Sequence, residues 1–172
     1  PVIAAVQGGC VGGALDLITA CDIRLASKEA FFCIQEVNIG MAADVGTLQR
    51  LPRLIPDSKM RELAYTGRKM LADEAKESGL VSSVFESQED MLKAANELAL
   101  DIATKSPVAI YGLKALMNYS RDHSIDDSLD FNALWSGAML SQKDMAEAMT
   151  AQMEKRDAAF NKMVDVKKFN EK

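Results

Sequence analysis

The chain has 172 residues, of which 48% are apolar and 26% charged, with a formal net charge of −5 at pH 7. This length and composition are typical of a globular protein with a hydrophobic core. We expect no nucleic-acid partner because the chain is acidic and has no basic stripe. We expect no membrane span because no apolar run is long enough to cross a bilayer. The sequence enters an apolar run directly after Pro1, so we expect it to be the C-terminal part of a longer protein.

The first half of the chain alternates strand-like and helix-like segments, which predicts an α/β fold. Residues 2–8, "VIAAVQG", form an apolar run with β-branched residues that stops at glycine, as a buried strand does. A helix is expected to open at Gly12–Gly13, with Leu15, Leu17 and Ile18 as its apolar contacts. Further strands are predicted at 23–27, 30–37 and 80–85, and further helices at 44–52, 57–67 and 72–79.

Helical periodicity dominates the sequence from Gln88 onward. Three serines in this half stand where helix N-caps are expected: Ser106 before Pro107, Ser124 before Asp127, and Ser141 before Asp144. We therefore divide the chain into residues 1–87, an α/β part, and residues 88–172, a helical part that ends in the polar tail 164–172.

Three acidic residues, Asp16, Glu36 and Asp44, stand among small and apolar residues in the segment that follows Gly12–Gly13. A glycine-rich turn at a helix N-terminus offers free backbone N–H groups that can hold an oxygen as it becomes anionic. Acids in an apolar pocket can exchange protons near neutral pH. Together, such groups suit the removal of a proton next to a carbonyl group.

Each of these residues also has an ordinary structural explanation. The glycines could serve only close helix–strand packing, Asp16 could bond Arg24 or a backbone group, and Glu36 could be a strand-edge acid. Asp44 taken alone is better explained as a helix N-cap. His123 is expected in a solvated loop, and the serines at 106 and 141 are expected as caps rather than nucleophiles. The spacing leaves these alternatives open.

The three cysteines, Cys10, Cys21 and Cys33, are an odd number in apolar surroundings, and their spacing matches no metal site. We expect reduced core cysteines in an intracellular protein, and no bound metal.

Four longer stretches resemble the crotonase family, the enoyl-CoA hydratase/isomerase superfamily. They are "PVIAAVQGGCVGGALDLITACDIRLAS", "YTGRKMLADEAKESGLVSSVF", and the helical "SPVAIYGLKALMN" with "DMAEAMTAQMEKRDAAF". The resemblance implies an α/β crotonase (ClpP-like) spiral of ββα units, N-terminally incomplete, with a C-terminal helical trimerisation region. It further implies a homotrimer or hexamer, an acyl-CoA substrate, and no cofactor, since CoA is part of the substrate.

Within the family, the spacing of Asp16, Glu36 in "EVNIG" and Asp44 in "MAADVGTLQRLPRLI" is similar to the dienoyl-CoA isomerase branch. That branch converts 3,5-dienoyl-CoA to 2,4-dienoyl-CoA in the β-oxidation of unsaturated fatty acids. Asn38 replaces the aspartate expected in "EVDVG", and Gln7 and Ala14 also depart from common choices. None of these differences removes a proton-transfer group.

The resemblance implies a role for each site residue. Asp44 is expected to act at carbon 2 and Glu36 at carbon 6, although the reverse assignment stays open. Asp16 is expected beside Glu36, where it would tune that residue's proton. The backbone N–H of Gly13, positioned with Gly12, would donate to the thioester oxygen.

Three other functions compete with this one. They are enoyl-CoA hydratase, delta(3)-delta(2)-enoyl-CoA isomerase, and a non-catalytic assembly subunit with the same fold; composition alone would also allow a generic α/β binding domain. The mitochondrion is favoured over the peroxisome, because the C-terminus "FNEK" is not a Ser-Lys-Leu signal. We expect the isolated 172-residue piece to have little activity, because a second oxyanion donor and most of the CoA-binding loop would lie upstream.

Overall fold

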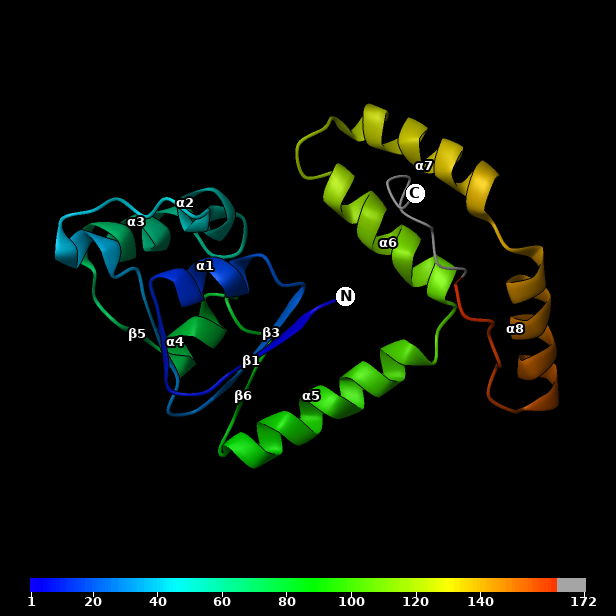
Figure 1. Ribbon diagram of the computed structural model, residues 1–172, viewed down its shortest axis with the longest axis horizontal. Coiled ribbons are helices and arrows are strands. Elements are labelled where there is room, and N and C mark those ends of the chain that lie inside the picture. Colours follow the sequence, from blue (N-terminus) through cyan, green and yellow to red (C-terminus); the bar gives the residue numbers. More distant parts are fainter. Residues whose placement is uncertain (164–172) are drawn as a thin grey trace, which may run out of the picture. The chain divides into compact units, whose positions relative to one another are not determined.

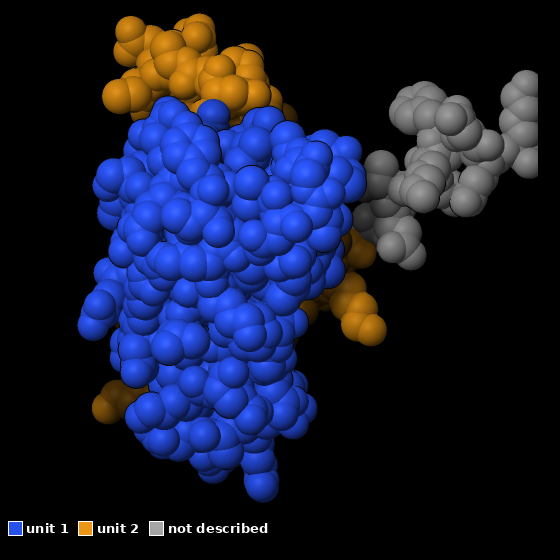
Figure 2. Space-filling model, turned by 90° about the vertical axis from the view of Figure 1, so that its left-hand side faces the viewer, with its two compact units in different colours: residues 1–98 blue, residues 99–172 orange. Residues whose placement is uncertain are grey.

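The computed structural model describes residues 1–163 and separates into two compact units, residues 1–98 and residues from Ala99 onward (Figures 1 and 2). The helix α5 (Gln88–Ala103) crosses the boundary between the units. The expected division after residue 87 therefore coincides with the start of α5 rather than with the change of unit. The polar tail expected at 164–172 lies outside the described residues.

The first unit contains two three-stranded sheets, and its first four strands alternate between them. One sheet has the order β1 (Ile3–Val6), β3 (Ile23–Ser27), β6 (Ser83–Phe85), and the other β2 (Gly9–Val11), β4 (Phe31–Cys33), β5 (Met70–Leu71). All the pairings are parallel except that of β4 with β5. The first four strands go alternately to the two sheets, β5 stays in the sheet of β4, and β6 returns to the first sheet. Parallel partners are joined through helices, as parallel pairing requires.

Short helices follow the strand pairs of this unit. They are α1 (Gly13–Thr19), the 3₁₀ helix η1 (Glu36–Ile39), α2 (Thr47–Arg50), the 3₁₀ helix η2 (Leu51–Arg53), α3 (Asp57–Thr66) and α4 (Ala72–Glu77). Phe32, Leu51 and Met70 are among the largest fully buried side chains of the single core that these elements enclose. The result is a sequence of ββα units, as predicted.

Several local predictions in this unit are wrong. The strand expected as buried, β1, has Val6 as its one buried residue, and the helix expected from Asp44 begins at Thr47. Leu17 is 69% exposed, whereas Leu15 and Ile18 of the same helix are buried, because α1 spans barely two turns and presents only one face to the core. The strand predicted over residues 30–37 ends at Cys33, because η1 begins at Glu36 and turns the chain away from the sheet.

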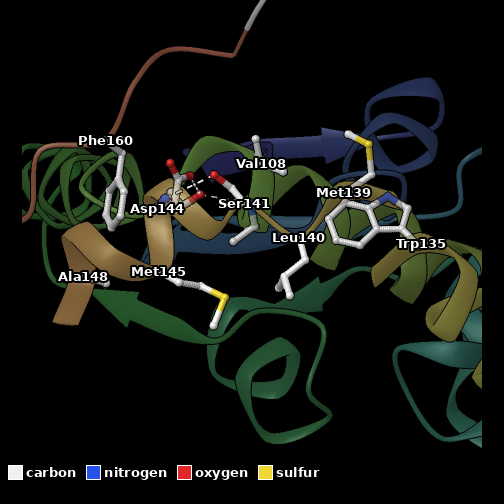
Figure 3. A pocket seen from close by; sticks show the side chains of 11 residues that line it. Val108, Trp135, Met139, Leu140, Ser141, Asp144, Met145, Ala148 and Phe160 are labelled. Carbon is white, nitrogen blue, oxygen red and sulfur yellow. Dashed lines mark hydrogen bonds between the residues drawn. The ribbon is translucent and has the colours of Figure 1, made fainter. Parts of the chain in front are cut away.

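The second unit is helical and contains α6 (Pro107–Tyr119), α7 (Ile125–Met139) and α8 (Gln142–Glu154). The three predicted serine caps are confirmed: Ser106 accepts from the N–H of Ala109, Ser124 from that of Asp127, and Ser141 from that of Asp144. An apolar pocket lies between these helices, with Trp135, Leu140, Met145 and Phe160 among its lining residues (Figure 3).

Candidate active site

The glycine turn at the start of α1 brings Glu36 to the backbone. Gly12 is the N-cap of α1 with φ 55°, a left-handed conformation that favours glycine, and its N–H donates to Cys33 C=O at 3.0 Å. A Cβ on Gly12 would lie 3.0 Å from Glu36 Oε1. The absence of a side chain at position 12 therefore allows the half-buried Glu36 carboxyl group to rest against the helix N-terminus.

The neighbouring Gly13 is the first residue of the helix and carries a backbone N–H without an intrahelical acceptor. The N–H groups of Leu15 and Asp16 bond back to Gly12 C=O. A Cβ on Gly13 would have no atom within 4 Å, so this residue faces open space. The Gly13 N–H can therefore receive an oxygen from a bound molecule.

Asp16 is buried, with an exposed fraction of 3%, and its carboxylate is committed to a backbone group. Its Oδ1 accepts the N–H of Thr47 at 2.7 Å. Thr47 is the first residue of α2, so Asp16 satisfies the N-terminus of a helix 31 residues away in sequence. Of the two structural alternatives for Asp16, the backbone bond is the one observed. Its expected position beside Glu36 stays a prediction.

Asp44 is not a helix cap. The residue at the N-cap of α2 is Gly46, with φ 111° and no side-chain cap bond, and the first N–H of the helix bonds to Asp16 instead. Asp44 lies two residues before Gly46 in an irregular segment and is exposed. The alternative that explained Asp44 as a cap is therefore wrong, and its carboxyl group is left available for chemistry.

The surroundings of the acids differ in part from expectation. Of the three acids only Asp16 is buried, whereas Glu36 is half-buried and Asp44 exposed. The interpretation of Glu36 as a strand-edge acid is wrong, because it belongs to η1. The segment from Glu36 to Val45 also exposes large apolar side chains, namely Val37, Ile39, Met41 and Val45. Glu36 and Asp44 thus share their segment with an apolar surface, which an acyl chain could cover.

Arg50 ties the Asp44 segment to α1. Its guanidinium group donates to Val45 C=O at 2.8 Å, to Asp16 C=O at 3.0 Å and to the Thr19 hydroxyl at 3.0 Å. Sequence reasoning missed Arg50 and Thr47, because their contacts with α1 span more than thirty residues and leave no local pattern.

The Cys33 thiol lies close to this site and is free, as are the other two cysteines. Burial and the charge of Glu36 raise the pKa of the Cys33 thiol, and Lys69 opposes them. Burial raises the pKa of Cys10 to about 12. Both thiols are therefore protonated at neutral pH, as expected of core cysteines.

The other residues singled out in the sequence have structural roles. His123 is exposed, stacks on Tyr119 and bonds through Nδ1 to Tyr119 C=O. Asn38 donates to Gly67 C=O at 2.9 Å, a bond that the aspartate expected there could not donate. Over residues 1–163, no helix is long and apolar enough to cross a membrane, and no three His, Cys, Asp or Glu residues group as metal ligands.

These features define an α/β scaffold in which the Glu36 carboxyl group adjoins a backbone turn that can bind an oxyanion. The sequence model of enoyl-CoA hydratase/isomerase matches residues 1–163, and the chain therefore belongs to this family. The crotonase fold expected from the sequence is thereby confirmed.

Three known proteins illustrate the similarity. Mitochondrial delta(3,5)-delta(2,4)-dienoyl-CoA isomerase of Mus musculus is 56% identical over 158 residues, which are 91% of this chain and 48% of the mouse protein. The peroxisomal protein of that name from Arabidopsis thaliana is 48% identical over 163 residues, 95% of this chain and 59% of the plant protein. The crystal structure of enoyl-CoA hydratase EchA1 from Mycobacterium marinum has a TM-score of 0.88 and 33% identity, over 94% of this chain and 66% of that one.

The chain spans about half the length of the curated relatives it matches. The resemblance to the dienoyl-CoA isomerases is confirmed by the similarity to the mouse and plant proteins. The described residues contain all three acids and the glycine turn.

Proposed function

We propose that the protein isomerises 3,5-dienoyl-CoA to 2,4-dienoyl-CoA, with Asp44 and Glu36 as the proton-transfer pair. Two observations carry the proposal. Glu36 and Asp44 stand on segments that hydrogen bonds or close contacts hold to α1, and the N–H of Gly13, the first residue of α1, has no acceptor within the helix. The similarity to relatives named for this reaction supports the choice of substrate.

The reaction needs two proton transfers and no net change in composition. A carboxylate removes a proton from carbon 2, and the electrons spread over the thioester oxygen and the diene. A carboxylic acid then protonates carbon 6, which moves the double bonds from carbons 3 and 5 to carbons 2 and 4. Each turnover leaves the base protonated and the acid ionised, so the two groups must re-equilibrate before the next one.

The residues divide these tasks between them. Asp44 takes the proton at carbon 2, Glu36 delivers the proton at carbon 6, and Gly13 N–H stabilises the developing charge on the thioester oxygen. Two carboxyl groups are required because carbons 2 and 6 lie well apart on an extended acyl chain. No cofactor takes part in this scheme, because CoA belongs to the substrate.

The oligomer and the compartment form part of the proposal. Across α6, α7 and α8, all within the described residues, only Gly112 and Ala151 are buried, and Leu134, Met149 and Met153 are among the exposed apolar residues. Such poorly covered helices favour association through this region, in a trimer or hexamer. The mitochondrial name of the mouse relative favours the mitochondrion, and the peroxisomal name of the plant relative makes the peroxisome the alternative.

The deciding experiment compares the intact protein with its Asp44→Asn variant. The conversion of 3,5-octadienoyl-CoA to the conjugated 2,4-dienoyl-CoA is followed by ultraviolet absorbance. We expect Asp44→Asn to lose activity by about 10²-fold or more, because it removes a proton carrier. Asp57→Asn, at an exposed position of α3, should retain it. Full activity in Asp44→Asn would remove Asp44 from the mechanism. A folded wild-type protein without activity would favour the assembly subunit.

A further inference from the structure

The segment that carries Asp44 has no regular structure of its own, yet Asp44 must hold a defined position to transfer a proton. Residues 41–46 contain no helix or strand, and Asp44 is exposed. The segment must therefore be held by contacts from outside it.

Two contacts hold its C-terminal end. Thr47 N–H donates to the buried Asp16 carboxylate at 2.7 Å, and Arg50 donates to Val45 C=O at 2.8 Å. Charge-assisted hydrogen bonds of this kind are stronger and more directional than neutral ones. The carbonyl that Arg50 holds belongs to the residue directly after Asp44.

The guanidinium group is itself anchored on the buried face of α1. It bonds to Asp16 C=O and to the Thr19 hydroxyl, each at 3.0 Å, and Thr19 is 1% exposed. The Thr19 hydroxyl also donates to Asp16 C=O at 2.7 Å. Arg50 therefore joins a fixed point on α1 to the residue after Asp44 through one rigid planar group.

Gly46 leaves the room that this arrangement needs. A Cβ on Gly46 would lie 2.2 Å from an Arg50 Nη atom, so the guanidinium group packs directly on the backbone of the Asp44 segment. Residue 46 has φ 111°, which disfavours any other residue. Gly46 thus leaves space for the Arg50 side chain, which contacts the backbone directly after Asp44.

We propose that Arg50 is a positioning residue, which fixes Asp44 relative to the Gly13 N–H so that the proton at carbon 2 lies within reach. The expected effect on proton transfer rests on the proposed function. The expected effect on the position of the Asp44 segment rests on the hydrogen bonds alone. A lysine at position 50 keeps the charge but lacks the planar fork that serves the three acceptors together.

The test combines kinetics with backbone hydrogen exchange in the intact protein. We expect Arg50→Lys to lower kcat for 3,5-octadienoyl-CoA by about 10- to 100-fold with little change in KM, since small misplacements of a reacting group cost this much. Arg61→Lys is the matched control, because Arg61 pairs with the exposed Asp57 of α3 and not with the site.

A double-substitution cycle separates positioning from general damage. If Arg50 acts through Asp44, adding Arg50→Lys to Asp44→Asn lowers kcat no further than Asp44→Asn alone. A 10-fold further loss in the doubly substituted protein, or a wild-type kcat in Arg50→Lys, would overturn the catalytic part of the inference.

Hydrogen exchange measures the structural part without reference to activity. In Arg50→Lys we expect amides 44–47 to exchange at least about 10-fold faster, with those of α3 unchanged. Unchanged exchange at 44–47 would overturn the inference whatever the kinetics. A third outcome separates the two proposals. If Arg50→Lys speeds the exchange of amides 44–47 but the wild type does not isomerise the substrate, Arg50 still positions Asp44 and the proposed function is rejected.

Discussion

The two adjacent glycines of the site, Gly12 and Gly13, are required for different reasons. Gly12 is required by the fold, since its φ is 55° and a side chain would meet Glu36. No such contact exists at Gly13, where a Cβ would enter open space. A glycine that folding does not require is best explained by a ligand that approaches its backbone closely.

Gly13→Ala should therefore separate activity from stability. We expect the melting temperature to stay within about 1 °C of the wild type, since nothing obstructs the added methyl group. Alanine keeps the N–H, but its methyl group would occupy the space through which the thioester oxygen approaches. The rate of dienoyl-CoA isomerisation should therefore fall by about 10²–10³-fold, as when an oxyanion donor is lost. Gly12→Ala provides the contrast and should lose both stability and activity. A fully active Gly13→Ala enzyme would show that the thioester oxygen binds elsewhere.

At this scale the sequence identified the chemical groups but not their bonds. Asp16, Glu36 and Asp44 were recognisable as acids in apolar surroundings, and their spacing matched one branch of a family. The commitment of Asp16 to Thr47 was not predictable, because the bond joins residues 31 apart and depends on how α1 packs against α2. The local sequence favours Asp44 as the N-cap of α2, whereas in the structure the carboxylate of Asp16 accepts the first N–H of that helix.

At the scale of elements, helix α6 contains a glycine that only its partner helix explains. A Cβ on Gly112 would lie 2.1 Å from the Trp135 ring of α7. On α7 itself, Gly137 has no atom within 4 Å of its Cβ position. Both glycines lie inside helices, where replacement by alanine normally stabilises by about 1 kcal/mol.

These two glycines should respond to alanine with opposite signs. Gly137→Ala should stabilise the protein by about 0.5–1 kcal/mol through helix propensity. Gly112→Ala should destabilise it by about 1–2 kcal/mol, because an overpacking cost of about 1–3 kcal/mol exceeds the gain in propensity. Urea unfolding at a fixed protein concentration, read by the fluorescence of the single tryptophan, measures both. A stabilised Gly112→Ala variant would mean that α6 and α7 do not pack as described.

A charged cluster joins α3 to α4. Arg68 bonds both oxygens of Glu74 at 2.6 and 2.9 Å, and Lys59 of α3 bonds Glu74 at 2.8 Å. The hydrogen bonds from Arg68 and then Lys59 lower the pKa of Glu74 from 4.5 to about 2. A carboxyl group whose pKa is lowered by folding stabilises the native state above its unfolded pKa.

Glu74→Gln should therefore destabilise the protein in a pH-dependent way. At pH 7 we expect a loss of about 1 kcal/mol, the upper end for a partly exposed ion pair. The difference from the wild type should shrink as the pH falls from about 4.5 towards 2, where Glu74 becomes protonated in the folded state too. Glu77 lies on the same helix and is exposed, so Glu77→Gln should change the stability little. Thermal unfolding between pH 7 and pH 3 tests this, and a pH-independent difference would contradict it.

Element boundaries were predictable wherever they are encoded locally. The serine caps of α6, α7 and α8 were correct because each cap bonds an N–H only three residues away. The 3₁₀ helix η1 was missed because Glu36 and Val37 continue an apolar strand-like run, and its turn is stabilised from outside by the bond from Asn38 to Gly67.

At the scale of the whole molecule, the helical unit contains little core of its own. Helix α7 has no buried residue in this chain, yet it carries apolar side chains on several sides, with Leu134 74% exposed. A helix with apolar residues all around is stable when its surface is covered. Because burial of one leucine contributes about 1.5–3 kcal/mol, covering several of these residues would provide a substantial driving force for association.

Leu134→Lys should therefore shift the assembly towards smaller species. Sedimentation velocity of the wild type should give a trimer or hexamer, and the lysine variant should dissociate at low micromolar concentration, because a charge buried without a partner costs several kcal/mol. Tyr65→Lys is the control: Tyr65 is 71% exposed but lies on α3 of the first unit. It should sediment as the wild type does. If Leu134→Lys also sediments unchanged, α7 is not part of the interface, and a monomeric wild type would remove the oligomer from the proposed function altogether.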